Sequence, residues 1–387
     1  MSEKHSLPVS TLKLANQLLL NGLRFQYLHW RGAPGKVQAV SLEITHNCIA
    51  KCIMCNIWKI SSKVPNLSIN DWLDFLSDDL LSDLRELDVT GGEPFLVNDL
   101  PSFFSGVCEL KRKNLRKLKS IAITTNGFLT DRILAYVEKA LPMLKDHDIG
   151  LVMVCAMDAI GAIHEKIRNY PDAWNKVNET IQGLKDLREK YSNLVIGLKT
   201  TVLPLNVDQL EDIAHYAKEN DLFTIISPCI ITDARYLNPD KAHELIFSQE
   251  DIQKMITFYQ SESFRWSYHA HTVVQGLKKE TTEKPCSCGF NYFFVRSNGQ
   301  VFLCPLINMN IGNIKEESLK CLLNSKKASQ FRKKIGKFPE CQRCTEPGLE
   351  RYALPYEGFS YLSLLFSMGP QNFFQLHKHM GLDKYFD

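Results

Sequence analysis

Six short runs of β-branched and apolar residues recur between residues 37 and 230, and helical patterns separate them. The runs are VQAVSLEIT (37–45), LRELDVT (84–90), LKSIAITTN (118–126), IGLVMVCAMD (149–158), NLVIGLKTTV (193–202) and FTIISPCI (223–230). Most are apolar throughout, which predicts strands buried on both faces of a parallel sheet. Successive runs start roughly 30 to 47 residues apart, the length of a βαβ unit. Right-handed crossovers would wind such units into an α/β fold, a (β/α)6 partial TIM barrel over about residues 38–235.

The chain after the last run differs in composition and in its predicted secondary structure. Residues 240–285 are typical of helix and connection, and from Cys286 onward cysteines, aromatic residues and turns dominate. We therefore expect five parts: an N-terminal amphipathic helix (1–37), the partial barrel (38–235), a helical connection (236–285), a small cysteine-rich domain (286–350) and an aromatic-rich tail (351–387).

Charge and apolar patterning exclude some classes of protein. The chain has 46 basic and 43 acidic residues, which does not indicate a dedicated nucleic-acid binder. No apolar run approaches the length of a transmembrane segment, and the polar start MSEKHSLPVS does not resemble a signal peptide. We therefore expect a cytoplasmic protein, a setting in which structural disulfides are rare. Its twelve cysteines then favour metal binding.

The two ends of the chain are less specific. STLKLANQLLLNGLRFQYLHW (10–30) has the spacing of an amphipathic helix. We prefer a helix that covers the floor of the barrel, and a membrane-surface helix is the alternative. We expect the tail from Tyr352 to pack on the body, with a lid or a lipid-facing surface as alternatives.

Three cysteines stand close together just after the first predicted strand. Cys48, Cys52 and Cys55 lie within HNCIAKCIMCNIW, at the edge of the sheet where α/β proteins place their chemistry. A closed zinc site needs four ligands. Three thiolates in one loop instead suit three corners of a [4Fe–4S] cluster, whose fourth iron is then open to a small molecule.

The spacing C-x3-C-x2-C resembles the signature of the radical S-adenosylmethionine (SAM) superfamily, and three further stretches resemble that family. TGGEP (90–94) resembles its GGE loop, TTNG (124–127) closes the third strand, and AMDAIGAIHEKIRN (156–169) resembles its S-x-D-G…H-x-x-x-R stretch. The resemblance covers nearly all of residues 38–350. It implies that SAM binds the open iron through its amino and carboxylate groups.

The resemblance also implies roles for single residues. Glu93 would offer its carboxylate to the methionine ammonium, beside Pro94, and Gly91 and Gly92 would let the backbone approach the ligand. The other matching positions are Asn126, Asp158, His164 and Arg168.

Three positions depart from the family pattern. Ala156 and Ala159 replace its serine and glycine, and Met54 stands where many relatives carry an aromatic residue. A thioether would then pack against the adenine. Without the resemblance, Asp158 could cap a helix, Glu93 could be a surface loop acid, and Arg168 could be a solvated helix residue.

Alternation along VIGLKTTV places Gly197, Lys199 and Thr201 on one face of the fifth strand. We expect this face to line the barrel interior, which makes Lys199 a candidate catalytic or substrate-facing residue. Asp233, Tyr236 and His271 are close by topology only, and the sequence does not single out a base.

A second set of cysteines follows the pattern C-x10-G-x4-C, a gap, and C-x2-C. It resembles the SPASM extension of radical SAM enzymes, in the shortened twitch version, because no cysteine follows Cys344. The resemblance implies one auxiliary [4Fe–4S] cluster held by Cys288, Cys304, Cys341 and Cys344, with Cys286 as the alternative to Cys288. A zinc ribbon with the same thiolates is the structural alternative. The other cysteines are expected to be buried apolar residues, namely Cys108, Cys155, Cys229 and Cys321.

The resemblance implies an enzyme that reductively cleaves SAM to a 5′-deoxyadenosyl radical and abstracts a substrate hydrogen, with flavodoxin or ferredoxin as electron donor. One auxiliary cluster favours oxidation or related modification of a small polar metabolite such as a sugar or aminocyclitol. A maturase of ribosomally made peptides is the alternative, although about 37 residues before the first strand are too few for a peptide-recognition domain. A non-catalytic iron–sulfur or zinc module is a third possibility, but it would not need the GGEP loop.

Overall fold

The computed structural model describes residues 11–264, 267–279, 284–346 and 348–377. Residues 1–10, on which the expectation of no signal peptide rests, lie outside this part, as do residues 378–387 of the expected tail. No helix among the described residues is both long enough and apolar enough to cross a membrane.

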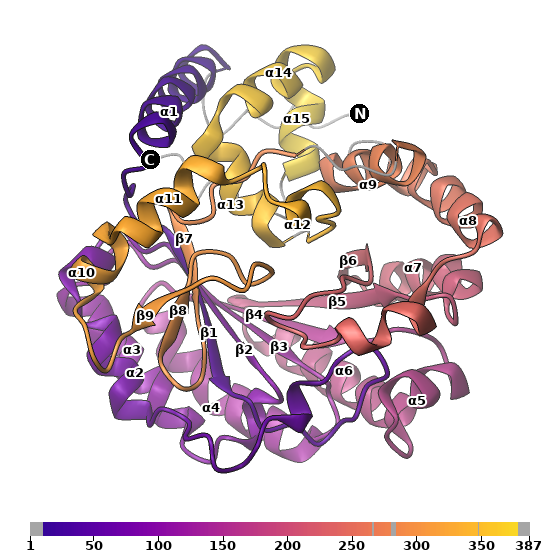
Figure 1. Cartoon of the computed structure of the whole chain (residues 1–387). Coiled ribbons are helices and arrows are strands. Elements are labelled where there is room, and N and C mark those ends of the chain that lie inside the picture. The colour runs from indigo at the N-terminus through magenta and orange to yellow at the C-terminus, as the bar shows by residue number, and fades with distance from the viewer. Residues whose placement is uncertain (1–10, 265–266, 280–283, 347, 378–387) are drawn as a thin grey trace, which may run out of the picture.

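The six predicted strands are present and parallel, and helices cover their outer side (Figure 1). They are β1 (Ala39–Thr45), β2 (Glu86–Gly91), β3 (Ser120–Thr125), β4 (Gly150–Ala156), β5 (Leu194–Val202) and β6 (Phe223–Pro228). Every residue of β1 is buried, because in a barrel of this kind one face meets the helices and the other faces the interior. The fold is the predicted partial TIM barrel.

The helices around the barrel follow the patterns between the strands. They are α2 (Ile69–Leu76), α3 (Leu100–Lys113), α4 (Thr130–Asp146), α5 (Ala162–Arg168), α6 (Ala173–Lys190) and α7 (Leu210–Glu219), with the short turns η1 (Ile57–Lys59), η2 (Asp79–Leu81), η3 (Pro94–Leu96) and η4 (Val207–Gln209). Ser68 starts α2 by accepting a hydrogen bond from the Asp71 N–H at 3.1 Å, and Asp71 accepts one from the Ser68 N–H at 2.9 Å. This reciprocal pair is a capping box.

The stretch after β6 is largely helical, as its sequence indicated. It contains η5 (Pro239–Leu245), α8 (Gln249–Tyr259), η6 (Glu262–Phe264) and α9 (Tyr268–Lys279). The helices that follow along the chain are α10 (Leu319–Asn324), α11 (Lys326–Lys334), α12 (Pro339–Gln342), α13 (Gly348–Glu357), α14 (Phe359–Met368) and α15 (Pro370–His377).

The cysteine-rich region adds three strands to the same sheet. They are β7 (Tyr292–Val295), β8 (Gln300–Phe302) and β9 (Asn310–Asn313). A hairpin turn at Asn298–Gly299 joins β7 and β8, and Gly299 takes the left-handed φ of +87° that favours glycine. The sequence did not predict that β7 pairs in parallel with β1, with Ala39 opposite Tyr292. Within the described chain the sheet therefore runs in the order β6-β5-β4-β3-β2-β1-β7-β8-β9.

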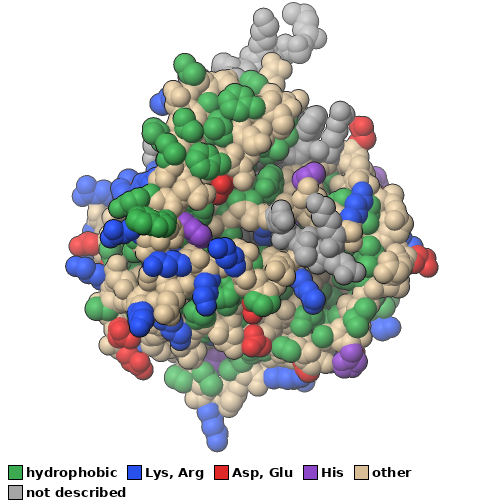
Figure 2. Space-filling view, turned by 45° about the horizontal axis from the view of Figure 1, so that its top comes forward, with side chains coloured by type: hydrophobic (Ala, Val, Ile, Leu, Met, Phe, Trp, Pro, Cys, Tyr) green, Lys and Arg blue, Asp and Glu red, His purple; other side chains and the backbone are tan. Residues whose placement is uncertain are grey.

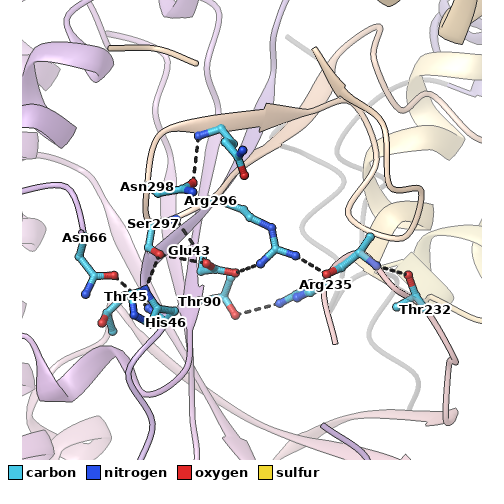
Figure 3. A network of polar contacts seen from close by, with 12 residues as sticks. Glu43, Thr45, His46, Asn66, Thr90, Thr232, Arg235, Arg296, Ser297 and Asn298 are labelled. Atoms are coloured by element: carbon cyan, nitrogen blue, oxygen red, sulfur yellow. Dashed lines mark hydrogen bonds and ion pairs between the residues drawn. The ribbon is translucent and has the colours of Figure 1, made fainter. Parts of the chain in front are cut away.

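A buried ion pair joins β1 to the turn region of this hairpin (Figure 3). Arg296 Nη1 lies 3.2 Å from Glu43 Oε2. The Ser297 hydroxyl donates to Glu43 Oε1 at 3.1 Å, and His46 Nδ1 lies 3.1 Å from the same hydroxyl. Arg296 also donates to the Ala234 carbonyl beyond β6. The network thus holds the hairpin, β1 and the segment after β6 in one arrangement.

The N-terminal helix packs against the C-terminal helices. In α1 (Thr11–Arg31), Leu14 and Leu18 lie in an apolar cluster with residues of α13, α14 and α15. Gly22 allows the close approach, because a Cβ there would lie 2.4 Å from Cδ1 of Phe359. Gln17, Asn21 and Arg24 share a cavity with Gln38 and Arg85, which precede β1 and β2. The helix therefore lies beside the N-terminal ends of these strands.

Candidate active site

A cavity opens at the C-terminal ends of the parallel strands, where their polar residues converge. Its walls include Thr90, Thr124, Ala156, Lys199 and Ser227, each from a different strand. All three cysteines of the predicted cluster loop line it as well. The cavity thus lies at the edge where an α/β fold places its chemistry.

The three loop cysteines are half-buried and close enough to influence one another. Burial raises the pKa of Cys48 and of Cys55 to about 12, and the neighbouring Cys52 thiol adds to both shifts. Iron binds cysteine in its deprotonated, thiolate form. Because burial favours the neutral thiols, nearby positive charge is needed to stabilise the thiolates. No three His, Cys, Asp or Glu side chains of the described chain are grouped around a point that could hold one metal ion. In a [4Fe–4S] cluster the thiolates bind different irons, so its ligands lie farther apart than those of one ion.

Gly91 and Gly92 lie so close to the backbone at the start of the cysteine loop that no side chain fits at either position. A Cβ on Gly91, whose φ is +152°, would lie 2.2 Å from the Thr45 carbonyl oxygen, and one on Gly92 would lie 2.1 Å from that of Asn47. The Gly92 N–H donates to Thr45 at 2.7 Å. We predicted that these glycines admit a ligand. The structure adds a second reason, because they let the end of β2 touch the start of the loop.

Glu93 is fully buried, so the alternative of a surface loop acid is wrong. Its carboxylate accepts hydrogen bonds from the Asn126 N–H at 2.7 Å, the Thr125 hydroxyl at 2.8 Å and the Phe95 N–H at 3.1 Å. Burial raises the pKa of Glu93 to about 7, and these three donors oppose the shift. Pro94 begins η3 and is buried beside it. Glu93 therefore fixes the end of β3 and keeps acceptor capacity for a further cation.

Asn126 offers an independent test of whether the cavity suits a ligand. Its Oδ1 accepts the Phe128 N–H at 3.0 Å, whereas its buried Nδ2 has no partner among the described residues. A buried donor without a partner costs about 1–3 kcal/mol. Because Asn126 lines the cavity, an acceptor on bound SAM is the natural partner, and the residues fit that cofactor.

Asp158 and Arg168 form a buried ion pair, with Arg168 Nε 2.7 Å from Asp158 Oδ2. Both alternatives are therefore wrong: Arg168 is not solvated, and Gly161, not Asp158, is the cap residue of α5. Arg168 Nη1 lies 3.8 Å from Cys52 Sγ. His164 Nδ1 accepts the Asp158 N–H at 3.1 Å, and burial with the nearby Arg168 lowers the pKa of His164 to about 2. His164 thus holds the Asp158 backbone, and the Asp158 carboxylate in turn holds the guanidinium at the cavity.

We expect Arg168→Lys to weaken SAM binding about tenfold, because a charge-assisted hydrogen bond contributes about 1.5–3 kcal/mol. Equilibrium dialysis with the reconstituted protein measures the change. Arg112→Lys, at an exposed side chain of α3, is the matched control and should bind SAM like the wild type. Equal affinity of both variants would contradict the assignment of Arg168 to the SAM site.

Of the other candidate residues from the sequence, some line the cavity and some lie outside it. Met54 is buried beside Ala159 and lines the cavity, as does Lys199. Tyr236 also lines it. Asp233 is exposed and accepts from Asn308 at 3.3 Å, and His271 is exposed on α9. Neither of these two belongs to the cavity wall, so they are dropped as candidate bases.

Sequence reasoning missed two charged residues of the cavity, Arg235 and Glu346. Arg235 Nη2 donates to Thr90 Oγ1 at 2.8 Å, and its guanidinium lies over the Tyr236 ring at 5.6 Å. Glu346 is buried, and the preceding Thr345 hydroxyl donates to the carbonyl of Pro228 at the end of β6 at 3.1 Å. Glu346 follows Cys344 by two residues, which was the available signal.

Five cysteines gather in the second site. Cys288 shares thiol hydrogen bonds with Cys286 and Cys304, and Cys341 and Cys344 lie within electrostatic range of these thiols. Donation from Cys288 lowers the pKa of Cys286 to about 7. The structure therefore brings together all the predicted ligands and the alternative, and the choice between Cys286 and Cys288 stays a prediction.

We expect Cys288→Ala to remove about four of roughly eight irons per reconstituted chain, because each [4Fe–4S] cluster holds four. Cys286→Ala should keep about eight, and it is the matched control two residues away. Iron analysis after anaerobic reconstitution distinguishes them. The reverse outcome would make Cys286 the ligand.

The four other cysteines were expected to be buried. Cys108 and Cys155 are. Cys321 is exposed on the short helix α10, where the outer face meets solvent, so that prediction is wrong. Cys229 is half-buried and lines the cavity, because it directly follows the end of β6.

Comparisons with known proteins agree with this geometry. A protein-family profile described as the radical SAM superfamily matches residues 42–217, and one described as SPASM, an iron–sulfur cluster-binding domain, matches residues 286–345. The sporulation killing factor maturation protein SkfB of Bacillus subtilis is 20% identical over 303 residues, which are 77% of this chain and 68% of SkfB. A GTP 3′,8-cyclase of Aliarcobacter butzleri is 27% identical over 177 residues, and the chain spans about half the length of that cyclase.

Two solved structures share the fold. Native anSMEcpe with bound AdoMet is 18% identical, with a TM-score of 0.56 over 90% of this chain and 99% of the other. Streptococcus suis SuiB bound to its precursor peptide SuiA is 14% identical, with a TM-score of 0.57 over 81% of this chain and 71% of SuiB.

Proposed function

The chain belongs to the radical SAM superfamily and carries a SPASM-type domain, and on that premise we propose that it abstracts a hydrogen atom from a small polar substrate bound between its two cluster sites. Its cofactors are SAM, a [4Fe–4S] cluster and an auxiliary iron–sulfur cluster. Cys48, Cys52 and Cys55 would hold the first cluster, which when reduced would supply the electron for SAM cleavage. The residues of this chain bind SAM, aim it at the substrate and keep water out.

The observation that carries the proposal is a set of charged residues that share the cavity with the cluster loop. Lys199, Arg235 and Glu346 line one cavity with Cys48, Cys52 and Cys55. Charged groups in a cavity wall favour a substrate with charged or strongly hydrogen-bonding groups. The cavity thus supports a compact polar metabolite, such as a sugar or aminocyclitol.

The segment that bears Glu346 also leads to the second cysteine site. Cys344, Thr345 and Glu346 are consecutive, and Thr345 is tied to the end of β6. A substrate at Glu346 would lie two residues along the chain from a ligand of the auxiliary cluster. In the oxidation that we propose, the substrate would first lose a hydrogen atom to the SAM-derived 5′-deoxyadenosyl radical, which becomes 5′-deoxyadenosine. The resulting substrate radical would then lose a proton, which Glu346 would accept, and an electron, which an auxiliary cluster held by the second cysteine site would accept.

We expect Glu346→Gln to keep SAM cleavage without substrate and to reduce product formation at least about a hundredfold, as loss of a general base does. The assay supplies a metabolite extract separated into small molecules and peptides, and measures 5′-deoxyadenosine above the substrate-free rate. Because hydrogen abstraction precedes the proton transfer, the small-molecule fraction should stimulate 5′-deoxyadenosine formation in both proteins, and a metabolite two hydrogens lighter should accumulate with the wild type only. Stimulation by the peptide fraction alone would overturn this substrate class.

Peptide modification is the second candidate, because SkfB is named as a maturation protein and SuiB is seen with a precursor peptide. An oxidoreductase that acts on a small metabolite and a peptide maturase would share the SAM site. In the first case a small metabolite would contact Arg235 and Glu346, and in the second a peptide would. The assay with the two fractions therefore separates the two candidates.

A further inference from the structure

Helix α1 has two apolar faces, and the body of the protein covers one of them. Leu14, Leu18, Gly22 and Phe25 are buried. The second face is exposed, with Leu12, Leu20 and Trp30 at 73%, 65% and 72%. Its members, which we call the α1 ridge, are Leu12, Leu19, Leu20, Leu23, Tyr27 and Trp30. With 3.6 residues per turn, all six fall within roughly 100° of the helix circumference.

The ridge is more than scattered surface hydrophobicity. A helix that only covers a globular body needs one apolar stripe, whereas contiguous exposed apolar side chains mark an interaction surface. The neighbouring α14 is also apolar. Its sequence FSYLSLLFSM contains no charged residue, and Phe366 is 71% exposed. Figure 2 shows green side chains gathered on the upper part of the molecule.

Cations border the ridge. Lys13, Arg24 and Arg31 lie within roughly 20° of one another along one edge of the ridge, and α1 contains no Asp or Glu. Helix α11 lies next to the end of α1, because Arg332 Nη1 donates to the Gly32 carbonyl at 3.3 Å. Its sequence KKASQFRKK also lacks acidic residues, and its exposed lysines are Lys326, Lys327, Lys333 and Lys334. Blue side chains lie beside and below the green ones in Figure 2.

More positive charge lies under α1. Besides Arg24, the cavity between α1 and the starts of β1 and β2 is lined by Lys36, Arg85 and Lys117, and the two lysines pair with Asp83 at 3.2 and 2.5 Å. Apolar ridge and basic border together have the arrangement of a helix that lies in the plane of a membrane surface.

We propose that the α1 ridge docks on a membrane surface that contains anionic lipids. Charge favours this occupant over a second copy of the chain, because a symmetric dimer would bring the cations of α1 and α11 against their equivalents with no acidic residue of either helix to pair with them. Anionic headgroups pair with those cations. Tyr27 and Trp30 suit the headgroup level, where amphipathic rings are enriched.

Sedimentation of the reconstituted full chain with vesicles tests this. Binding is expected to vesicles of equal parts phosphatidylcholine and phosphatidylglycerol, to weaken with salt, and to be absent with phosphatidylcholine alone. Leu23→Glu should lower the partition coefficient at least about tenfold, because burying one leucine contributes about 1.5–3 kcal/mol. Ile246→Glu, at an exposed apolar residue outside the ridge, is the matched control and should bind like the wild type.

Two results would overturn the proposal. One is no binding to the anionic vesicles at low ionic strength. The other is a wild-type dimer in light scattering that Leu23→Glu converts to a monomer, since a second copy would then occupy the ridge. 5′-Deoxyadenosine formed without vesicles reports folding, and it should be equal in wild type and Leu23→Glu because α1 lies away from the strand ends that bear the cavity.

Discussion

Cys52→Ala is expected to abolish SAM cleavage and to remove about four of roughly eight irons per chain. Cys52 lies between the other two cysteines of the loop and is the thiol that Arg168 approaches at 3.8 Å. Two remaining thiolates cannot hold the cluster in place, so no electron reaches SAM. Iron content and 5′-deoxyadenosine are measured on the same anaerobic preparation.

Cys321→Ala is the matched control, because this cysteine is exposed on α10. It should keep about eight irons and the full rate. Replacing both Cys341 and Cys344 should remove the second set of irons and spare at least part of SAM cleavage. If Cys52→Ala still cleaved SAM at the wild-type rate, the cluster would not be held by this loop.

The second large effect concerns the ion pair that joins β1 to the cysteine-rich hairpin (Figure 3). Glu43 is 2% exposed at its side chain and Arg296 11%. Glu43→Gln leaves the guanidinium buried without its counter-charge, which costs about 3–5 kcal/mol of unfolding free energy. Anaerobic urea unfolding followed by circular dichroism should show this loss as a lower urea concentration at the unfolding midpoint.

A double substitution and a surface control sharpen the result. Glu43→Leu with Arg296→Met removes both charges and should recover most of the lost stability, since an apolar pair of similar volume avoids the desolvation cost. Lys119→Met breaks the exposed pair with Asp148 and should cost less than about 1 kcal/mol. Equal costs for Glu43→Gln and Lys119→Met would show that the buried pair does not hold the hairpin.

The barrel was predictable because its signals are local. Each strand is a short apolar run, Ser68 begins α2 through a side chain three residues from its partner, and Asn298–Gly299 forms a turn by itself. The spacing of the cysteines in both sites resembles that of a known family, and this resemblance suggested them as ligands. Such patterns depend on neighbours in the chain, which a single sequence displays.

Pairing and approach across long sequence separations were not predictable. The parallel contact of β7 with β1 joins residues about 250 positions apart. The sequence of a four-residue strand does not indicate which other strand it pairs with. The same holds for Arg235 and Glu346, which reach the cavity only because the segments after β6 and Cys344 fold back over it. Asp233 and His271 seemed equally placed by topology, and the fold turns them outward.

Burial decided the remaining alternatives. Glu93, Asp158 and Arg168 could each have been ordinary surface residues in the sequence, and all three are buried in contact with the strand ends or the cysteine loop. Charged groups are seldom buried without partners. Their ion pair and hydrogen bonds therefore indicate a site built around charge.

Formation of 5′-deoxyadenosine by the reduced wild-type protein tests the central claim most directly. The protein is reconstituted with iron and sulfide without oxygen, reduced with dithionite and given SAM. We expect 5′-deoxyadenosine and methionine in equal amounts, with neither formed when the reductant is omitted. A preparation that holds about eight irons per chain and yields no 5′-deoxyadenosine under these conditions would contradict the account.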